Sequence, residues 1–247
     1  MPLPGMAALG EPADKAMGFA TANDAELLRR LDFHRAYKTA YEVACIEEAN
    51  RIAAAGHAAT QTALAQEPSQ QSEFQLNQTY CQATRQREVE LPYQSIVALN
   101  EHASTLHYQN LDRDPPGEFL SFLLDAGVEF NGYASDVTRT VSGSTGEFDA
   151  LIASMDDLQK RLCSETRNGI NFIALNDLTH QLLAEVLEKH RLIACSAGEA
   201  YDRGITRTFL PHGLGHLLGL QVHDAGGRLS TPDGRVRLRL KNTRFSD

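Results

Sequence analysis

The chain has 247 residues, enough for one large domain or two small ones, and its 42% of hydrophobic residues can supply a core. The net charge of −9 and the lack of a basic stripe argue against a nucleic-acid partner. The apolar runs are far too short to cross a bilayer, which argues against a membrane partner, and residues 1–30 lack the pattern of a secretory signal.

The cysteines indicate the redox compartment. They are widely spaced and include no C-x-x-C pair, so a zinc–thiolate site is not expected. We predict reduced, mostly buried thiols in a cytoplasmic protein at Cys45, Cys81, Cys163 and Cys195.

The N-terminal residues 1–31 are predicted to be a flexible leader, in which residues 25–31 could form a helical turn or two. Thr39 and Glu42 then form a capping box, because each side chain can bind the backbone N–H of the other residue. Apolar residues follow at helical spacing, so we predict a helix that ends near Gly56.

A second capping box, Ser72 with Gln75, predicts a helix to about Thr84. Residues 92–100 have the pattern of a strand that runs into a loop. Two histidines follow, each of which could be a surface residue, a core residue or a ligand: His102 and His107.

The dipeptide Asn131-Gly132 predicts a type I′ hairpin turn, because both residues tolerate a positive φ. One face of the hairpin should then be apolar and belong to the core. The implied register places Phe130 opposite Tyr133, Gly127 opposite Asp136, and Asp125 opposite Thr138.

Two aspartates, Asp125 and Asp136, become diagonal neighbours on the other face, with Cβ atoms about 7 Å apart. Gly127 should leave empty space beside them. The two carboxylates repel, and Arg139 is expected on the opposite face, so a divalent cation such as manganese, magnesium or calcium could hold them together. The alternative is a pair of solvated aspartates on an exposed hairpin.

Two further helices are predicted after the hairpin, over residues 148–167 and 176–190, separated by Asn168-Gly169. The predicted order is therefore two helices followed by the sheet, and then a second pair of helices. This order suggests two similar α/β halves that pack against each other with a site between them.

A stretch rich in histidine and glycine lies at residues 211–224. Its glycines disfavour a regular helix, and Gly213 stands where a zincin helix needs glutamate, so we predict a loop followed by a short strand over residues 217–224. A glycine loop with incidental histidines is the alternative. Two aspartates with one imidazole would suit manganese, cobalt, iron or zinc better than calcium. The stretch contains three histidines: His212, His216 and His223.

Three segments resemble successive signatures of the bacterial Xaa-Pro dipeptidase (prolidase) family, within the creatinase/methionine aminopeptidase group. They read ALNEHASTLHYQNLD, SFLLDAGVEFNGYASDVTRTVS and FLPHGLGHLLGLQVHD. The resemblance implies an α+β pita-bread fold with two pseudo-symmetric halves. Residues 1–31 would be a leader and the remnant of an N-terminal domain, and residues 32–247 a catalytic domain that lacks its C-terminal strands.

The resemblance also implies a site with two divalent metal ions, manganese first and cobalt or zinc as alternatives. Asp125 would chelate one ion, Asp136 would bridge both, and His216 would bind the second. Thr138 would orient the ligands. Three histidines would line the substrate pocket, and the last would contact the substrate or stabilise the tetrahedral intermediate: His107, His212 and His223.

The implied reaction is the hydrolysis of Xaa-Pro dipeptides by a hydroxide that bridges the metals. The family's two glutamate ligands follow the histidine stretch, and no counterpart is recognisable here. We therefore expect impaired activity, with an inactive pita-bread fragment or binding module as the alternative. Acidic residues after His223 are Asp224, Asp233 and Asp247.

Other members of the group remain alternatives, namely methionine aminopeptidase and creatinase-like amidinohydrolases, and organophosphate triesters are a plausible promiscuous substrate by resemblance. The resemblance also implies a homodimer, although the missing domain would supply part of its contacts. Candidates for a clamp on the substrate carboxylate are Arg239, Lys241 and Arg244.

Overall fold

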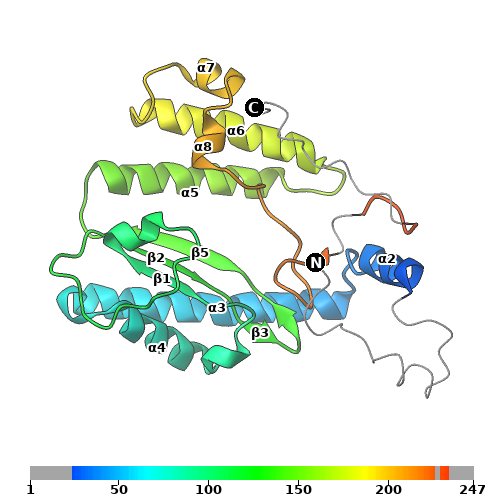
Figure 1. The fold of residues 1–247 in the computed structure, drawn as a ribbon, viewed down its shortest axis with the longest axis horizontal. Coiled ribbons are helices and arrows are strands. Elements are labelled where there is room, and N and C mark those ends of the chain that lie inside the picture. The colour runs from blue at the N-terminus through cyan, green and yellow to red at the C-terminus, as the bar shows by residue number, and fades with distance from the viewer. Residues whose placement is uncertain (1–23, 226–228, 234–247) are drawn as a thin grey trace.

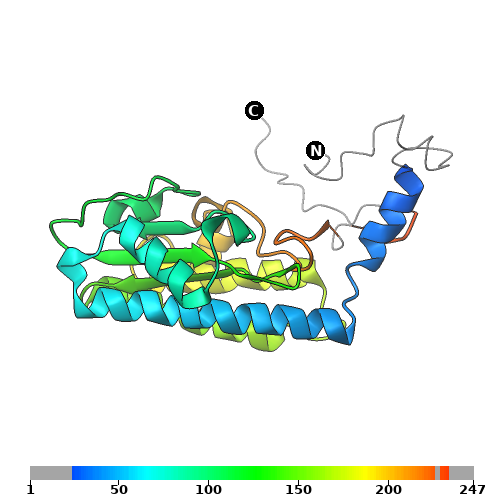
Figure 2. The same ribbon diagram turned by 90° about the horizontal axis from the view of Figure 1, so that it is seen from below.

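The computed structural model of the protein describes residues 24–225 and 229–233. A three-stranded antiparallel sheet lies along a long helix, α3, and a second group of helices lies beyond one edge of this sheet (Figures 1 and 2). No helix in the described part of the chain is both long and apolar enough to span a bilayer.

The helix α2 (Ala25–His34) begins at Asp24, whose side chain accepts hydrogen bonds from the next backbone N–H groups. Residues 25–31 thus belong to a helix that is longer than expected, because it continues to His34. The earlier part of the predicted leader lies outside the described residues.

The helix α3 (Ala40–Gln66) begins with the predicted capping box of Thr39 and Glu42. The prediction that it ends near Gly56 is wrong. A Cβ at Gly56 would lie 2.6 Å from side-chain atoms of Tyr80 and Thr84, so this glycine permits close packing of α3 against the next helix.

That next helix, α4 (Glu73–Thr84), has the predicted bounds, and its capping box of Ser72 and Gln75 is confirmed. Arg85 ends it in the left-handed conformation. The strand predicted within residues 92–100 is β1 (Ile96–Leu99). Short 3₁₀ turns flank these elements: η1 (Pro68–Gln70), η2 (Glu88–Glu90) and η3 (Asn100–Ser104).

The predicted hairpin and its register are confirmed. Asn131 and Gly132 have φ values of 51° and 83°, as a type I′ turn requires. The sheet order is β1-β2-β5, and Asp125 pairs with Thr138. The strands are β2 (Ser121–Ala126), β3 (Glu129–Phe130), β4 (Tyr133–Ala134) and β5 (Val137–Ser142).

Alternate residues of β2 are buried, as expected for a strand with one face in the core. Burial on this face fixes the register, because a shift by one residue would turn the apolar side chains to the other face. The apolar side chains on this face belong to a hydrophobic core that the sheet shares with α3 and α4. This core includes Ala53, Leu64, Leu76, Tyr80, Val97, Leu99, Phe122, Leu124, Ala126 and Val128.

A separate apolar cluster holds together the second group of helices. The helix α5 (Glu147–Glu165) packs along β5, and α6 (Phe172–Lys189) packs on α5 (Figure 1). Asn171 caps α6, so this helix starts earlier than the predicted residue 176. Two short helices follow: α7 (Ala197–Asp202) and α8 (Thr206–Phe209).

The short strand predicted over residues 217–224 is wrong. Within the described residues the segment has a single backbone hydrogen bond to a strand, from Ala134 N–H of β4 to the Gly219 carbonyl, and it folds back on itself, because Asp224 N–H donates to the Leu217 carbonyl. All four cysteines are unpaired, but only Cys45 is buried and Cys163 is exposed, so the prediction of mostly buried thiols is also wrong. The clamp candidates Arg239, Lys241 and Arg244 lie outside the described residues.

Candidate metal centre

Asp125 and Asp136 lie together on the expected face of the hairpin, and a tyrosine hydroxyl bridges them. Tyr93 Oη lies 2.7 Å from Asp125 Oδ1 and 2.9 Å from Asp136 Oδ1. A phenol carries one hydrogen, so it cannot donate a full hydrogen bond to both carboxylates at once. The two carboxylates therefore share the single donor that Tyr93 provides.

The space expected beside Gly127 is filled, so that prediction is wrong. A Cβ at Gly127 would clash with the Ser135 carbonyl oxygen and would lie 2.7 Å from Tyr93 Cε1 and 3.0 Å from Pro92 Cγ. Gly127 is therefore required for the close approach of the tyrosine ring to the hairpin.

The pKa values of Asp125 and Tyr93 are perturbed by their surroundings. Burial, together with the negative charge of Asp136, raises the pKa of Asp125, while hydrogen bonds from Tyr93 and Thr138 act in the opposite direction. Burial and the two carboxylates also raise the pKa of Tyr93 far above its usual range. Tyr93 thus stays a neutral donor, and a cation would relieve the repulsion between the two carboxylates.

Two histidines of the 211–224 stretch complete this group. His216 Nε2 lies 3.1 Å from Asp136 Oδ2, and the His216 and His223 rings meet edge to face with centroids 4.3 Å apart. Ligand atoms of Asp136, His216 and His223 all lie within 4.8 Å of one another. The structure thus brings residues of the hairpin and of the histidine stretch to one place, although they are far apart in the sequence.

Three other predicted site residues, His107, Thr138 and His212, lie outside this group. His107 is exposed, and its charge acts on Asp125, whose pKa it lowers. Thr138 lies directly across the β2–β5 ladder from Asp125. His212 is exposed on the loop, with Nδ1 3.1 Å from the Gly213 carbonyl, and no contact with the metal-binding candidates places it in the centre.

The histidine stretch is tied to the N-terminal helices by a buried carboxylate. Asp224, directly after His223, lies 2.6 Å from both Lys38 Nζ and Arg35 Nε and is 4% exposed. A Cβ at Gly219 would clash with the Asp224 carboxylate, so glycine is needed for this folded-back loop. The Gly219 carbonyl also accepts a hydrogen bond from Ala134 N–H of β4, which fixes the loop to the hairpin.

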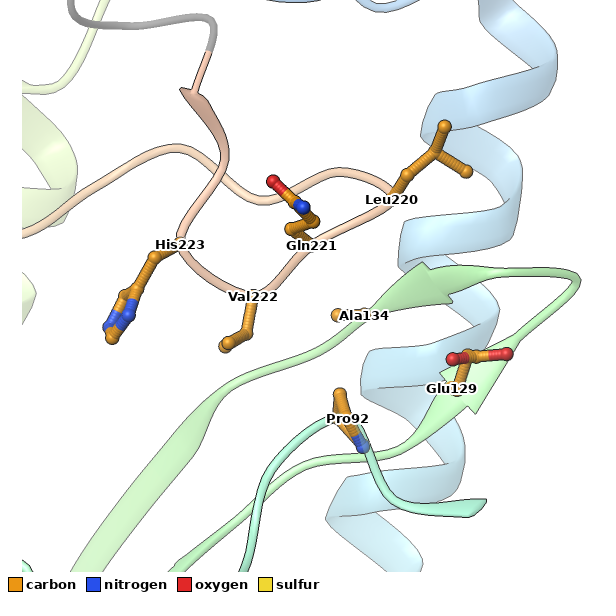
Figure 3. A pocket seen from close by; sticks show the side chains of 7 residues that line it. All are labelled: Pro92, Glu129, Ala134, Leu220, Gln221, Val222 and His223. Carbon is orange, nitrogen blue, oxygen red and sulfur yellow. The ribbon is translucent and has the colours of Figure 1, made fainter. Parts of the chain in front are cut away.

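A hollow of about 270 Å³ lies between this loop and the hairpin. Figure 3 shows His223 at one end of the hollow and Glu129 at the other, with Pro92 and Ala134 on the floor facing Val222. The volume is slightly below the usual range of small-molecule sites, so only a small ligand would fit. A small ligand in this hollow would lie beside the group formed by Asp136, His216 and His223.

Residues 44–243 match the sequence pattern of metallopeptidase family M24. The chain belongs to this family.

Curated relatives of this M24 chain cover most of its length. A Xaa-Pro dipeptidase of Serratia proteamaculans is 47% identical over 214 residues, which are 86% of this chain and 48% of that protein. A Xaa-Pro dipeptidase of Shewanella pealeana is 44% identical over 228 residues, 92% of this chain and 51% of that protein. The chain therefore spans about half the length of the curated relatives it matches.

Solved structures confirm the expected pita-bread fold of family M24. Zinc-substituted aminopeptidase P of Escherichia coli, in complex with product, superposes with a TM-score of 0.71 at 24% identity, covering 84% of this chain and 47% of that one. Proline aminopeptidase P II of Yersinia pestis gives 0.67 at 27% identity, covering 84% and 48%.

The donor set of this M24 chain fits divalent metal ions. Two carboxylates lie close together, and histidine imidazoles lie beside one of them. A set of carboxylate oxygens with imidazole nitrogen suits manganese, cobalt, iron or zinc. Asp224 cannot extend this set, because two cationic side chains already bind its carboxylate. Asp136, His216 and His223 form a group that could hold a metal ion, and Asp125 is linked to Asp136 through the hydroxyl of Tyr93.

Sequence reasoning missed Tyr93 and the cluster of Arg35, Lys38 and Asp224. Both depend on contacts between segments that local patterns do not relate. The available signals were weak: Tyr93 follows Pro92 at the entry to a predicted strand, and Asp224 directly follows a candidate histidine.

Proposed function

We propose that this chain carries the metal-binding site of a dipeptidase that hydrolyses Xaa-Pro dipeptides. The single observation that carries the proposal is the convergence of Asp125, Asp136, His216 and His223 beside a hollow. Supporting it, the curated relatives at 44–47% identity are named Xaa-Pro dipeptidases.

We assign each residue the role that its position supports. Asp125, Asp136 and His216 hold divalent metal ions, with manganese proposed first. When bound, the ions supply the Lewis acidity that polarises a peptide carbonyl. Tyr93 keeps the two carboxylates together, and Thr138 orients Asp125.

Three histidines are assigned to the substrate rather than to the metals. His223 lies at one end of the hollow, so its imidazole can donate a hydrogen bond to a substrate oxygen there. His107 faces the site from the loop before β2, where its charge acts on Asp125. His212 is assigned to the outer part of the pocket because its side chain is exposed on the same loop as His216.

The metal assignment is tested by measuring bound manganese after loading and gel filtration. We expect metal in the wild-type protein, none in Asp136→Ala, and the wild-type amount in Glu185→Ala, which removes an exposed carboxylate from α6. Equally little metal in wild type and Asp136→Ala would overturn the proposal.

The hydrolase assignment is tested with Gly-Pro and Ala-Pro in added manganese. We expect weak hydrolysis by the wild-type chain that is lost in Asp125→Ala. Metal binding without hydrolysis would instead assign the chain as an inactive metal-binding module. Good cleavage of methionine-terminated peptides alone would replace the prolidase assignment with a methionine aminopeptidase.

We also propose a cytoplasmic location and a homodimer. The four unpaired cysteines support a reducing compartment. The dimer is proposed from the family resemblance alone, and sedimentation of the purified chain would measure it.

A further inference from the structure

A buried carboxylate outside the metal centre binds one loop at four points. Glu73 is the first residue of α4 and is 1% exposed. Its Oε1 accepts from Leu99 N–H at 2.9 Å and lies 2.8 Å from His102 Nδ1. Its Oε2 accepts from Tyr108 Oη–H at 2.7 Å and from Asp112 N–H at 2.8 Å. All four donors belong to the single segment 99–112.

This arrangement does not suit a second metal, although Glu73, His102 and Asp112 bring ligand atoms within 4.8 Å of one another. A carboxylate offers about four lone-pair positions, and the four donors occupy them. The hydrogen bond to Glu73 also raises the pKa of His102, which favours the protonated imidazole over a metal ligand. Glu73 therefore acts as an anchor for protein groups.

The anchored segment has a backbone that local preferences do not explain. Leu111 has a φ of 53°, in the left-handed region that leucine rarely adopts, and Asn100 and His107, of types that adopt this region more readily, have φ values of 53° and 59°. Such conformations persist where surrounding contacts determine them. Here the contacts to Glu73 and the stacking of His102 on Tyr108, with centroids 4.6 Å apart, supply that constraint.

The anchored segment begins at the end of β1, the strand that pairs with the strand of Asp125. Leu99 ends β1 opposite Phe122, three residues before Asp125, which is about 10 Å along the strand. His107 lies within the anchored segment, and its charge acts to lower the pKa of Asp125. His107 sits next to Tyr108, one of the four anchored residues.

We propose that Glu73 is a positioning residue, which fixes the loop 99–112 through four hydrogen bonds and thereby fixes the position of His107, the neighbour of Tyr108 in this loop. The proposed role of His107 toward substrate rests on the proposed function. The placement of His107 by Glu73 does not, because it follows from contacts within the chain.

The placement is tested in the metal-free protein by Glu73→Gln. The amide NH₂ cannot accept hydrogen bonds, so at least one side of the loop loses its anchor. We expect the ring signals of His107 in ¹H–¹⁵N spectra to shift or broaden, while those of the buried His180 in α6 stay in place. The control Gln75→Ala removes the capping box of the same helix and should leave the His107 signals unchanged. Unchanged His107 signals in a folded Glu73→Gln protein would overturn the proposal.

A second variant keeps the test decisive if Glu73→Gln does not fold. Tyr108→Phe removes one donor and leaves the other three. We expect amide exchange of Asp112 to become about 10-fold faster or more, while exchange in the middle of α3 stays at the wild-type rate. Equal acceleration at both places would mean that Glu73 contributes global stability only, which contradicts the proposal.

Activity separates this proposal from the proposed function. If the wild-type chain cleaves Gly-Pro, Glu73→Gln should retain the wild-type manganese content and lose about 10-fold or more of kcat/KM, because His107 is misplaced while the metal ligands are not. An inactive wild-type chain would end the proposed function and leave the spectroscopic test of Glu73 intact. Wild-type kcat/KM in Glu73→Gln would overturn the positioning role.

Discussion

Lys38 Nζ lies 2.6 Å from Asp224 Oδ2, and this ion pair joins the segment before α3 to the residue after His223. Arg35 binds the other oxygen of the same carboxylate. Replacing Asp224 with asparagine removes the counter-charge of Lys38 and leaves Arg35 only its 3.9 Å contact with Asp32, in a largely buried place, which costs about 3 kcal/mol or more. We expect the free energy of unfolding of Asp224→Asn, measured with urea, to fall by about that amount.

A solvent-exposed ion pair provides the control for this prediction. Glu48 and Arg51 form a pair on the surface of α3, and water and salt screen such pairs. Glu48→Gln should therefore leave the urea midpoint unchanged. Similar losses in both variants would show that burial adds nothing to the Asp224 cluster.

Gly127 permits the contact between the hairpin and the Tyr93 ring. Gly127→Ala places a methyl group against the Ser135 carbonyl oxygen and the tyrosine ring, and overpacking of this kind costs about 1–3 kcal/mol. We expect a lower melting temperature for this variant. Gly117→Ala is the control, because a Cβ at Gly117 meets nothing within 4 Å. Equal melting temperatures for the two variants would contradict the close packing.

The sequence predicts the parts of the fold and site that local geometry determines. Both capping boxes and the hairpin register depend on residues a few positions apart, so Asp125 and Asp136 are correctly placed on one face. The family signatures add His216, which local patterns alone leave as one of three candidate histidines.

The parts that failed depend on distant packing partners. Tyr93 is 32 residues from Asp125, and Lys38 is 186 residues from Asp224, so no periodicity relates them. Gly56 looked like the end of a helix because its packing partners lie on α4. The strand expected at residues 217–224 has the right composition, but a strand also needs a ladder of hydrogen bonds to a neighbour, and within the described residues only the bond from Ala134 N–H to the Gly219 carbonyl forms.

Asp125 should make the stability of the metal-free protein fall as the pH rises. Its pKa is raised in the native state, so the native protein holds this proton at pH values where the unfolded chain has released it. The loss of stability begins above about pH 4, the ordinary pKa of aspartate, and is complete above the raised native pKa of Asp125. Asp125→Asn removes the titrating group.

The measurement is urea unfolding of wild type and Asp125→Asn in a chelator, across pH 4 to 8. The variant should gain stability relative to wild type as the pH rises through the window, and the gain should then stay constant. A difference that does not change with pH would contradict the raised pKa of Asp125.

Loss of the hydroxyl should have opposite effects on stability at the half-buried Tyr93 and at the buried Tyr80. Tyr93 Oη lies within hydrogen-bond distance of two carboxylates, so Tyr93→Phe should lower the free energy of unfolding of the metal-free protein by about 1–3 kcal/mol. Tyr80 Oη is buried and has no hydrogen-bond partner within the described residues. Tyr80→Phe removes an unsatisfied polar group, so stability should stay the same or rise. Equal losses in urea unfolding would mean that the Tyr93 bridge contributes no more than its ring packing.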